Sequence, residues 1–191
     1  MLSKKAVLQS VCNNYEDLIN VTSPHNAEYA DKIGFDYILH KNLEVLGRSI
    51  AKHDRAPAWN KIYSIKYLFE KGYDQIFLLD GDAVVVDKEK NVLDLKEGKE
   101  DKSIHICCDG LGKTLIHVNT GAIFIEKNKY TIQFIENIIN TPNSLWHNTR
   151  NWEQNAIHEE LDKAEFLYTK IVQLYDSDYF NHNSDWVFHP C

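Results

Sequence analysis

Short apolar runs alternate with amphipathic segments along the first half of the chain. The runs have few polar positions, as is typical of strands buried on both faces of an α/β sheet. The segments between them carry apolar residues at helical spacing, with Ser23-Pro24 as a helix start and Gly34 and Gly72 as stops. The pattern predicts strands at Lys5–Cys12, Phe35–Leu39 and Gln75–Asp80, with helices at 23–34 and 56–71 between them. This order is a βαβαβ unit.

The pattern in the second half of the chain predicts further strands and helices, followed by an irregular tail. A charged stretch, Asp87–Lys102, is expected to connect the halves along the surface. The elements expected after it are strands at Ile104–Cys108 and Thr120–Ile125, helices near Lys129–Asn140 and Trp152–Leu161, and a last strand at Ile171–Leu174. The tail is irregular and rich in aromatic residues and asparagine. A length of 191 residues suits one domain, residues 1–191, with a full core.

Two carboxylates separated by one glycine end the most apolar of these runs. Asp80 and Asp82 should lie at the carboxyl end of a central strand, where ligands bind in α/β sheets. Side chains two apart on an extended segment point the same way, and Gly81 allows a close approach, so both carboxylates can bind one divalent cation. A cation with few protein ligands leaves room for substrate phosphates. The alternative is that the two aspartates only end a strand and cap a turn.

Composition restricts the partners. A net charge of -7 argues against general affinity for nucleic acid or an anionic membrane. The first apolar stretch is broken by Gln9 and Ser10, so we expect neither a signal peptide nor a membrane span. The four cysteines lack a Cys-x-x-Cys spacing, which indicates reduced thiols and a cytoplasmic protein.

The order of the motifs resembles the metal-dependent nucleotide-sugar glycosyltransferases of GT-A fold, especially glycosyltransferase family 34, over nearly the whole chain. The segments that carry the resemblance are Lys61 on a helix before the strand, Tyr73–Ala83, Asn119–Ile125, Trp152–Ala156 and Phe188–Cys191. The resemblance implies a mixed sheet flanked by helices. It also implies transfer of a sugar from a nucleotide-diphosphate donor, a UDP-sugar, to a glycan or another hydroxyl acceptor, with retention of the anomeric configuration.

Carried over to this chain, the resemblance implies a metal site. Asp80 and Asp82 would bind Mn²⁺ or Mg²⁺ together with the donor diphosphate, and His189 would supply a further ligand from the far end of the sequence. Imidazole beside carboxylates suits Mn²⁺ better than Mg²⁺, which prefers oxygen alone. A plain surface position in the tail is the alternative for His189.

Donor-binding residues follow from the same comparison and from residue chemistry. The segment after the first strand, Cys12, Asn13, Asn14 and Tyr15, would hold the base and ribose; the alternative is an asparagine-rich turn, which is also common. Arg48 and Lys61 belong to the one basic concentration in an acidic chain and could meet the diphosphate, beside Asp80 and Gly81. Gly121 would allow close approach of the donor sugar.

Three residues are expected to face the sugar. Asn119 would hydrogen-bond a hydroxyl, and Glu153 and Gln154 match the acidic, amide-containing helix start of the family. The family often has aspartate where Glu153 stands, so a role as nucleophile or base is an open question. An ordinary first helical turn is the alternative, since glutamate there favours the helix dipole.

One departure from the family pattern and two other functions have to be weighed. The family continues past its His segment with glycine and lysine, whereas this sequence stops at Cys191, so a longer polypeptide or a reduced phosphate clamp is expected. A haloacid-dehalogenase-type phosphatase also uses an apolar strand followed by Asp-x-Asp, with Asp80 as nucleophile. That class normally places this strand first in the chain, whereas a βαβα unit precedes it here. A non-catalytic nucleotide-sugar binder is the third class.

Overall fold

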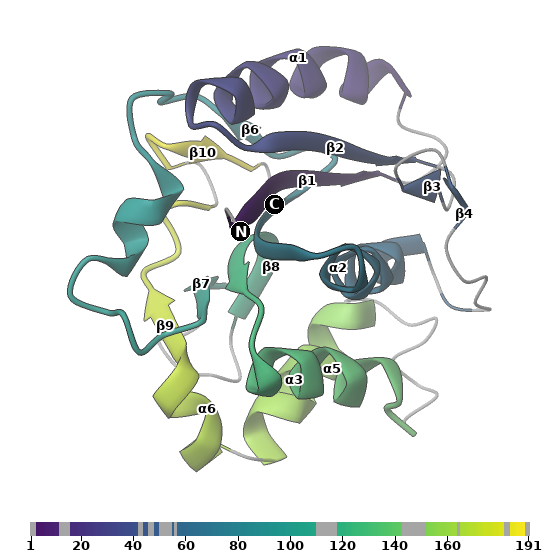
Figure 1. Cartoon of the computed structure of the whole chain (residues 1–191), viewed down its shortest axis with the longest axis vertical. Helices are drawn as coiled ribbons and strands as arrows, with labels where there is room; N and C mark the ends of the chain where they lie inside the picture. The colour runs from purple at the N-terminus through teal and green to yellow at the C-terminus, as the bar shows by residue number, and fades with distance from the viewer. Residues whose placement is uncertain are drawn as a thin grey trace.

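A computed structural model describes residues 3–11, 16–41, 44–45, 48–49, 55, 57–109, 118–142, 152–163, 165–181 and 184–189. In this part of the chain, a mixed sheet lies between helices on its two faces (Figure 1). Its strands, in spatial order, are β4 (Arg48–Ser49), β3 (Glu44–Val45), β2 (Asp36–Lys41), β1 (Lys4–Val11), β5 (Tyr73–Asp80), β8 (Val118–Glu126), β7 (Ile104–Cys108) and β9 (Val172–Tyr175). A two-stranded ribbon, β6 (Val84–Val85) with β10 (Val187–Phe188), lies beside it. The predicted α/β class with a mixed sheet is confirmed.

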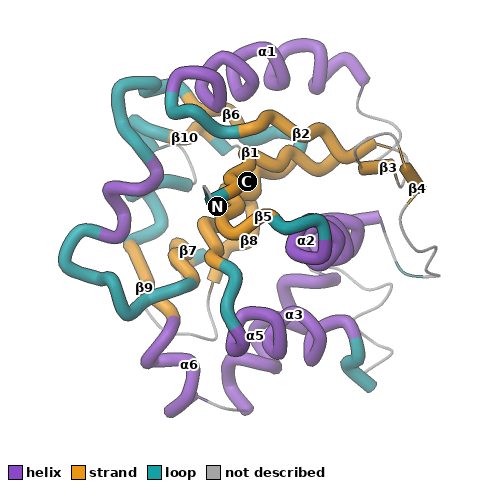
Figure 2. Tube along the Cα trace, viewed as in Figure 1, coloured by secondary structure: helices purple, strands orange, loops and turns teal. Residues whose placement is uncertain are grey.

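Helices cover the two faces unequally. The helices are α1 (Glu16–Lys32), α2 (Asn60–Glu70), α3 (Lys129–Ile139), α5 (Trp152–Lys163) and α6 (Glu165–Ile171), with short 3₁₀ turns η1 (Pro57–Trp59) and η2 (Val92–Lys96). Figure 2 shows α1 along one face, next to β2 and β6, and α2, α3 and α5 grouped on the other. None of the described helices has the length and apolarity needed to cross a membrane.

Successive side chains of the central strands point to opposite faces of the sheet and so contribute to two hydrophobic cores. In β5, Ile76 and Leu78 pack toward α2, α3 and α5, while Phe77 and Leu79 pack toward α1 and the tail. All four side chains are fully buried. Because successive side chains point to opposite faces, one apolar run serves both cores, which is why the run carries no polar position.

Strand directions bring three segments to one edge of the sheet. Strands β1, β2 and β5 are parallel, which confirms the βαβαβ unit, and Ser10 pairs with Asp80 at their carboxyl ends. Strand β8 runs antiparallel to β5, with Ala122 opposite Leu79. The amino-terminal part of β8 therefore lies beside the carboxyl end of β5, and Asp80 and residues 119–121 share this edge.

The prediction that a helix begins at Ser23-Pro24 is wrong. Helix α1 starts at Glu16 and contains Pro24 in its interior. A proline there removes the hydrogen bond to the carbonyl of Asn20, four residues earlier. Asn20 is exposed, so water can satisfy that carbonyl, and Thr22 packs inward with its hydroxyl on the Leu18 carbonyl. The packing of α1 on the sheet therefore outweighs the preference of proline for the first turn of a helix.

The charged stretch 87–102 is attached more firmly than a surface connection. It contains η2, whose Val92 and Leu95 are buried in the core beneath α1 and the tail.

The carboxyl-terminal elements differ from the prediction in two places. Helix α6 was not predicted, and it ends at Ile171, so the last strand of the main sheet is Val172–Tyr175 and not Ile171–Leu174. In the irregular tail, residues 187–188 form β10. Cys107 and Cys108 are buried, and neither is in a disulfide.

Candidate functional site

Three potential metal ligands from distant parts of the sequence meet at the carboxyl end of β5. One ligand atom each from Asp80, Asp82 and His189 lies within 4.8 Å of the others. The Nε2 atom of His189 is 3.2 Å from Asp82 Oδ1 and 3.9 Å from Asp80 Oδ2. Asp80 and Asp82 are partly exposed and His189 is buried, so the cluster faces solvent through its carboxylates. Among the described residues, this is the one group of at least three such ligands.

The β6–β10 ribbon places His189 in this cluster. Strand β6 begins two residues after Asp82, and Phe188 pairs with Val84. The carbonyl of Trp186 accepts a hydrogen bond from the N–H of Val86 at 2.8 Å. Val187 is fully buried and anchors the ribbon in the core. The residue after β10 is thereby brought back to the turn that carries Asp82.

Gly121 forms the wall behind the imidazole ring. A Cβ atom at this position would lie 2.2 Å from His189 Cε1 and 2.3 Å from Nδ1, which no side chain can accommodate without moving the ring. The pairing of β8 with β7 shifts here, from Ile123 opposite Ile106 to Asn119 opposite Cys107. Such bulges change the direction of side chains beside active sites. The group that closely approaches Gly121 in this structure is His189, and the expected approach of a donor sugar stays a prediction.

Lys61 joins two carboxylates beneath the cluster. Its ammonium group lies 2.6 Å from Asp80 Oδ1 and 2.9 Å from Glu153 Oε1, and only 4% of the residue is exposed. Burial alone would lower the pKa of Lys61, but the charges of Asp80 and Glu153 raise it above its usual value. Lys61 therefore carries a positive charge whose contacts are with these carboxylates in this structure.

Glu153 has one oxygen bound and one available. Its Oε1 accepts hydrogen bonds from Lys61 and from the Thr120 hydroxyl, the latter at 3.0 Å. Its Oε2 is buried and has no hydrogen-bond partner among the described residues. Gln154 accepts a bond from the Thr120 N–H at 3.3 Å. A buried carboxylate oxygen without a partner is costly, so Glu153 Oε2 is an acceptor that an N–H or O–H group of a ligand or a water could satisfy.

Asn119 is held by the backbone and the tail. Its Oδ1 accepts hydrogen bonds from the Gly121 N–H at 2.8 Å and from Asn181 Nδ2 at 2.9 Å. Sequence reasoning did not single out Asn181, which is fully buried, or Thr120, which links Lys61, Glu153 and Gln154. Neither has a motif of its own, and only its position in the fold gives it a role.

Gly81 packs against β1. A Cβ atom there would lie 3.1 Å from Val11 Cγ2, so a side chain would press on that strand. The Gly81 carbonyl accepts hydrogen bonds from Gln9 and Thr22, at 3.1 and 2.9 Å. These bonds fix the turn between the two aspartates. In that turn, burial alone would raise the pKa of Asp82, but His189 lowers it below its usual value.

Five predicted donor-binding residues lie beyond this description. Cys12, Asn13, Asn14 and Tyr15 fall outside the described residues, and so does the side chain of Arg48. Their expected contacts with base, ribose and diphosphate stay predictions. The other nine predicted site residues gather at one edge of the sheet: Lys61, Asp80, Gly81, Asp82, Asn119, Gly121, Glu153, Gln154 and His189.

Comparison with solved structures identifies the fold. The chain matches a glycosyltransferase involved in the glycosylation of the major capsid of PBCV-1, with a TM-score of 0.76 over 98% of this chain and 94% of that one, at 15% identity. The chain has a GT-A glycosyltransferase fold. No family model and no curated protein matches its sequence.

Two further glycosyltransferases share the fold at greater distance. GlyE of Streptococcus pneumoniae TIGR4 matches with a TM-score of 0.57 at 15% identity, over 93% of this chain and 46% of GlyE. The catalytic domain of Drosophila beta1,4-galactosyltransferase 7, solved with xylobiose, matches with a TM-score of 0.50 at 13% identity, over 100% of this chain and 71% of that one. The present chain therefore spans about half of GlyE, and the expected GT-A architecture is confirmed.

Proposed function

We propose that this chain is a metal-dependent glycosyltransferase that moves a sugar from a UDP-sugar to a hydroxyl of a glycan. The observation that carries the proposal is the Asp80–Asp82–His189 cluster at the carboxyl end of β5, on a glycosyltransferase fold. Ligands bind at that edge in α/β sheets. Residues 1–191 would form one catalytic domain, and retention of the anomeric configuration remains the expectation from family resemblance.

The donor set fits a divalent cation. Two carboxylates and one imidazole offer ligand atoms within 4.8 Å of one another, and the Gly121 wall holds the imidazole in place. The mixture of oxygen and nitrogen favours Mn²⁺ over Mg²⁺. When bound, the cation would neutralise the charge that builds on the leaving diphosphate. Asp80, Asp82 and His189 would hold the cation, and through it the diphosphate of the donor, at the edge of the sheet.

The buried network beneath the cluster would present the catalytic groups. Lys61 and Thr120 fix Glu153 through Oε1, which leaves Oε2 as an acceptor for a sugar hydroxyl. Gln154 and Asn119 complete the wall that would face the sugar. Lys61 acts in this proposal as a positioning residue, because its charge is shared by Asp80 and Glu153 and not directed at solvent.

The fold disfavours the phosphatase alternative. The Asp80 strand is the third long strand in the chain and pairs with antiparallel β8, in an architecture shared with glycosyltransferases. A non-catalytic nucleotide-sugar binder differs from the enzyme in one measurable respect. The enzyme transfers or hydrolyses the sugar of its donor, and a binder does not.

Binding of UDP should require the cation. Asp80 and Asp82 alone would repel a diphosphate, since like charges raise the energy of the complex. We expect calorimetric titration with UDP to give a measurable Kd in Mn²⁺ and no detectable binding in chelator. Equal affinity in both solutions would contradict the proposed site. The same titration with Mg²⁺ and with Ca²⁺ tests the preferred ion.

His189→Ala should raise the Mn²⁺ concentration needed for half-maximal donor hydrolysis by roughly tenfold or more, because changes even outside the ligand set cost that much. The matched control is His25→Ala, an exposed histidine on α1. Both variants and the parent are compared in one Mn²⁺ titration, with Kd for UDP measured alongside. A His189→Ala curve that overlies the parent would remove His189 from the ligand set.

A further inference from the structure

A second polar hollow, of about 430 Å³, lies between η2 and the tail. The hollow is lined by Lys90, Asn91, Asp94 and Leu95 from η2 and the two residues before it, and by Asp178, Tyr179, Asp185 and Trp186 from the tail. Its volume falls within the range of small-molecule sites. None of the Asp80–Asp82–His189 cluster is among its described lining residues, so it is separate from the proposed donor site.

Tyr179 presents an open aromatic surface in this hollow. One face of its ring stacks on Tyr175, at a centroid distance of 4.7 Å and an angle of 17°. The residue is nevertheless 53% exposed, so the opposite face and edge of the ring meet solvent. Tyr175 is itself fixed, because its hydroxyl donates to the Leu95 carbonyl of η2 at 2.9 Å. The aromatic surface is therefore rigid before any ligand arrives.

Three carboxylates line the hollow with this ring, and so does Lys90, whose ammonium group is 3.8 Å from Asp87 and 5.7 Å from the centre of the Trp186 ring. Asp94, Asp178 and Asp185 are exposed, and none forms an ion pair within the described part of the chain. They do not form a cation site, because the one group of three ligands that meets within coordination distance in the described residues is the cluster at β5. Ionised carboxylates accept hydrogen bonds only, so a matching ligand has several donors and no negative charge.

We propose that this hollow is a subsite for a neutral oligosaccharide, the remote part of the glycan acceptor. The apolar face of a sugar ring stacks on Tyr179, while its hydroxyls donate to the carboxylates and accept from Asn91 Nδ2, since Asn91 Oδ1 already accepts a hydrogen bond from the Leu93 N–H. A hollow with an aromatic ring and hydrogen-bond acceptors matches both the apolar face and the polar hydroxyl edge of a sugar ring. Three aspartates against one lysine in the lining, together with the net charge of -7, disfavour an anionic chain.

The position of Trp186 connects the hollow to the transfer site. Trp186 lines the hollow, and His189 in the metal cluster is three residues further along the chain. Three residues span at most about 11 Å when extended. A glycan of a few sugars can therefore lie in the hollow while its terminal hydroxyl reaches the donor. That the bound glycan is the acceptor of the transfer rests on the proposed function, whereas the binding of a glycan in the hollow does not.

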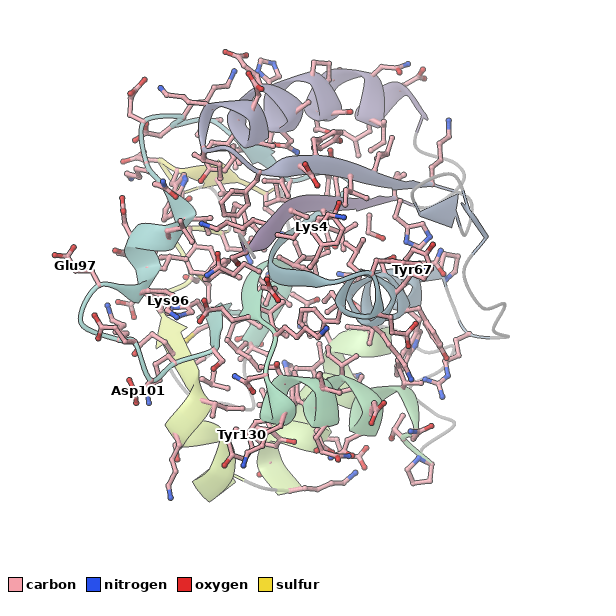
Figure 3. All side chains as sticks on the ribbon, in the orientation of Figure 1. Lys4, Tyr67, Lys96, Glu97, Asp101 and Tyr130 are labelled. Carbon is pink, nitrogen blue, oxygen red and sulfur yellow. The ribbon has the colours of Figure 1, made fainter. Side chains whose placement is uncertain are left out.

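The test is calorimetric titration with four neutral tetrasaccharides, cellotetraose, xylotetraose, mannotetraose and maltotetraose, in chelator so that the metal site is silent. We expect at least one to bind the parent, and Tyr179→Ala to weaken it about tenfold. Tyr179→Trp should retain binding, and Asp178→Asn should weaken it. The control is Tyr130→Ala, which removes another exposed tyrosine. Figure 3 shows Tyr130 at the start of α3, away from Lys96 at the end of η2 and from Glu97, which follows it.

The outcomes separate this subsite from the donor site. Tyr179→Ala should keep the parent's Kd for UDP in Mn²⁺, so a failure of the hollow leaves the donor site intact. Loss of UDP binding in the parent would instead refute the proposed function and leave the tetrasaccharide result to stand by itself. The subsite is overturned if no tetrasaccharide binds the parent, if Tyr179→Ala binds as the parent does, or if oligolysine alone binds and 0.5 M salt, roughly where screening dominates, abolishes it.

Discussion

Asp82→Asn should abolish sugar transfer while leaving the folded chain intact. The change keeps the shape of the side chain and removes a charge that would bind the cation. Loss of several kcal/mol of charge stabilisation corresponds to a drop in kcat of about a thousandfold or more. Asp82 is partly exposed and its carboxylate lies 3.2 Å from the imidazole of His189, so little of the stability depends on it. Initial rates at saturating Mn²⁺ and a thermal melt test both statements.

The control for this change is Asp87→Asn, on the same connection. Asp87 lies outside the cluster, where its carboxylate accepts a bond from the Glu89 N–H and is 3.8 Å from Lys90. We expect parental activity from this variant. Asp82 would instead be a structural residue if the melting temperature of Asp82→Asn falls steeply and its activity falls only as much as the fraction of folded protein does.

Lys61→Met should produce a large loss of stability. It leaves Asp80 and the buried Glu153 without the cation between them, and breaking such a pair from one side costs about 3–5 kcal/mol. For a chain of this size, that lowers Tm by on the order of 10 °C. The measurement is thermal unfolding in chelator, so that an added metal does not compensate for the missing charge.

Lys66→Met is the matched control, from the same helix. Its ammonium group is 3.5 Å from Glu136 and about two-fifths exposed, and surface pairs of this kind contribute about 0–1 kcal/mol. Adding Glu153→Gln to Lys61→Met should recover part of the lost stability, because it removes one of the two uncompensated charges. Equal melting temperatures for the two single methionine variants would mean that Lys61 does not hold the carboxylates in solution.

The central sheet could be predicted from the sequence because its strands are buried on both faces. The run from Ile76 to Leu79 leaves no alternative to an interior strand, and Asp80 marks its end without ambiguity. The peripheral elements were harder. Pro24 is a strong local signal for a helix start, and packing on the sheet overrides it, while η2 hides two buried residues in a highly charged stretch.

The site was predictable in its residue types and less so in its contacts. Asp80 and Asp82 follow from strand geometry, whereas His189 entered only through family resemblance, since nothing local indicates a long-range pairing of β10 with β6. The sequence places Lys61 near a phosphate by charge alone. The structure shows it between two carboxylates, a contact that requires three elements to be assembled first.

The contact between Gly121 and His189 also constrains how this protein can diverge. A side chain at position 121 occupies the space of the imidazole ring, so the first substitution there displaces His189. A smaller residue at position 189 removes that restriction. The two positions are therefore epistatic: alanine at 121 is harmful in the present background and tolerated once the histidine is gone. Any lineage that abandons the histidine frees a glycine more than 60 residues earlier in its sequence.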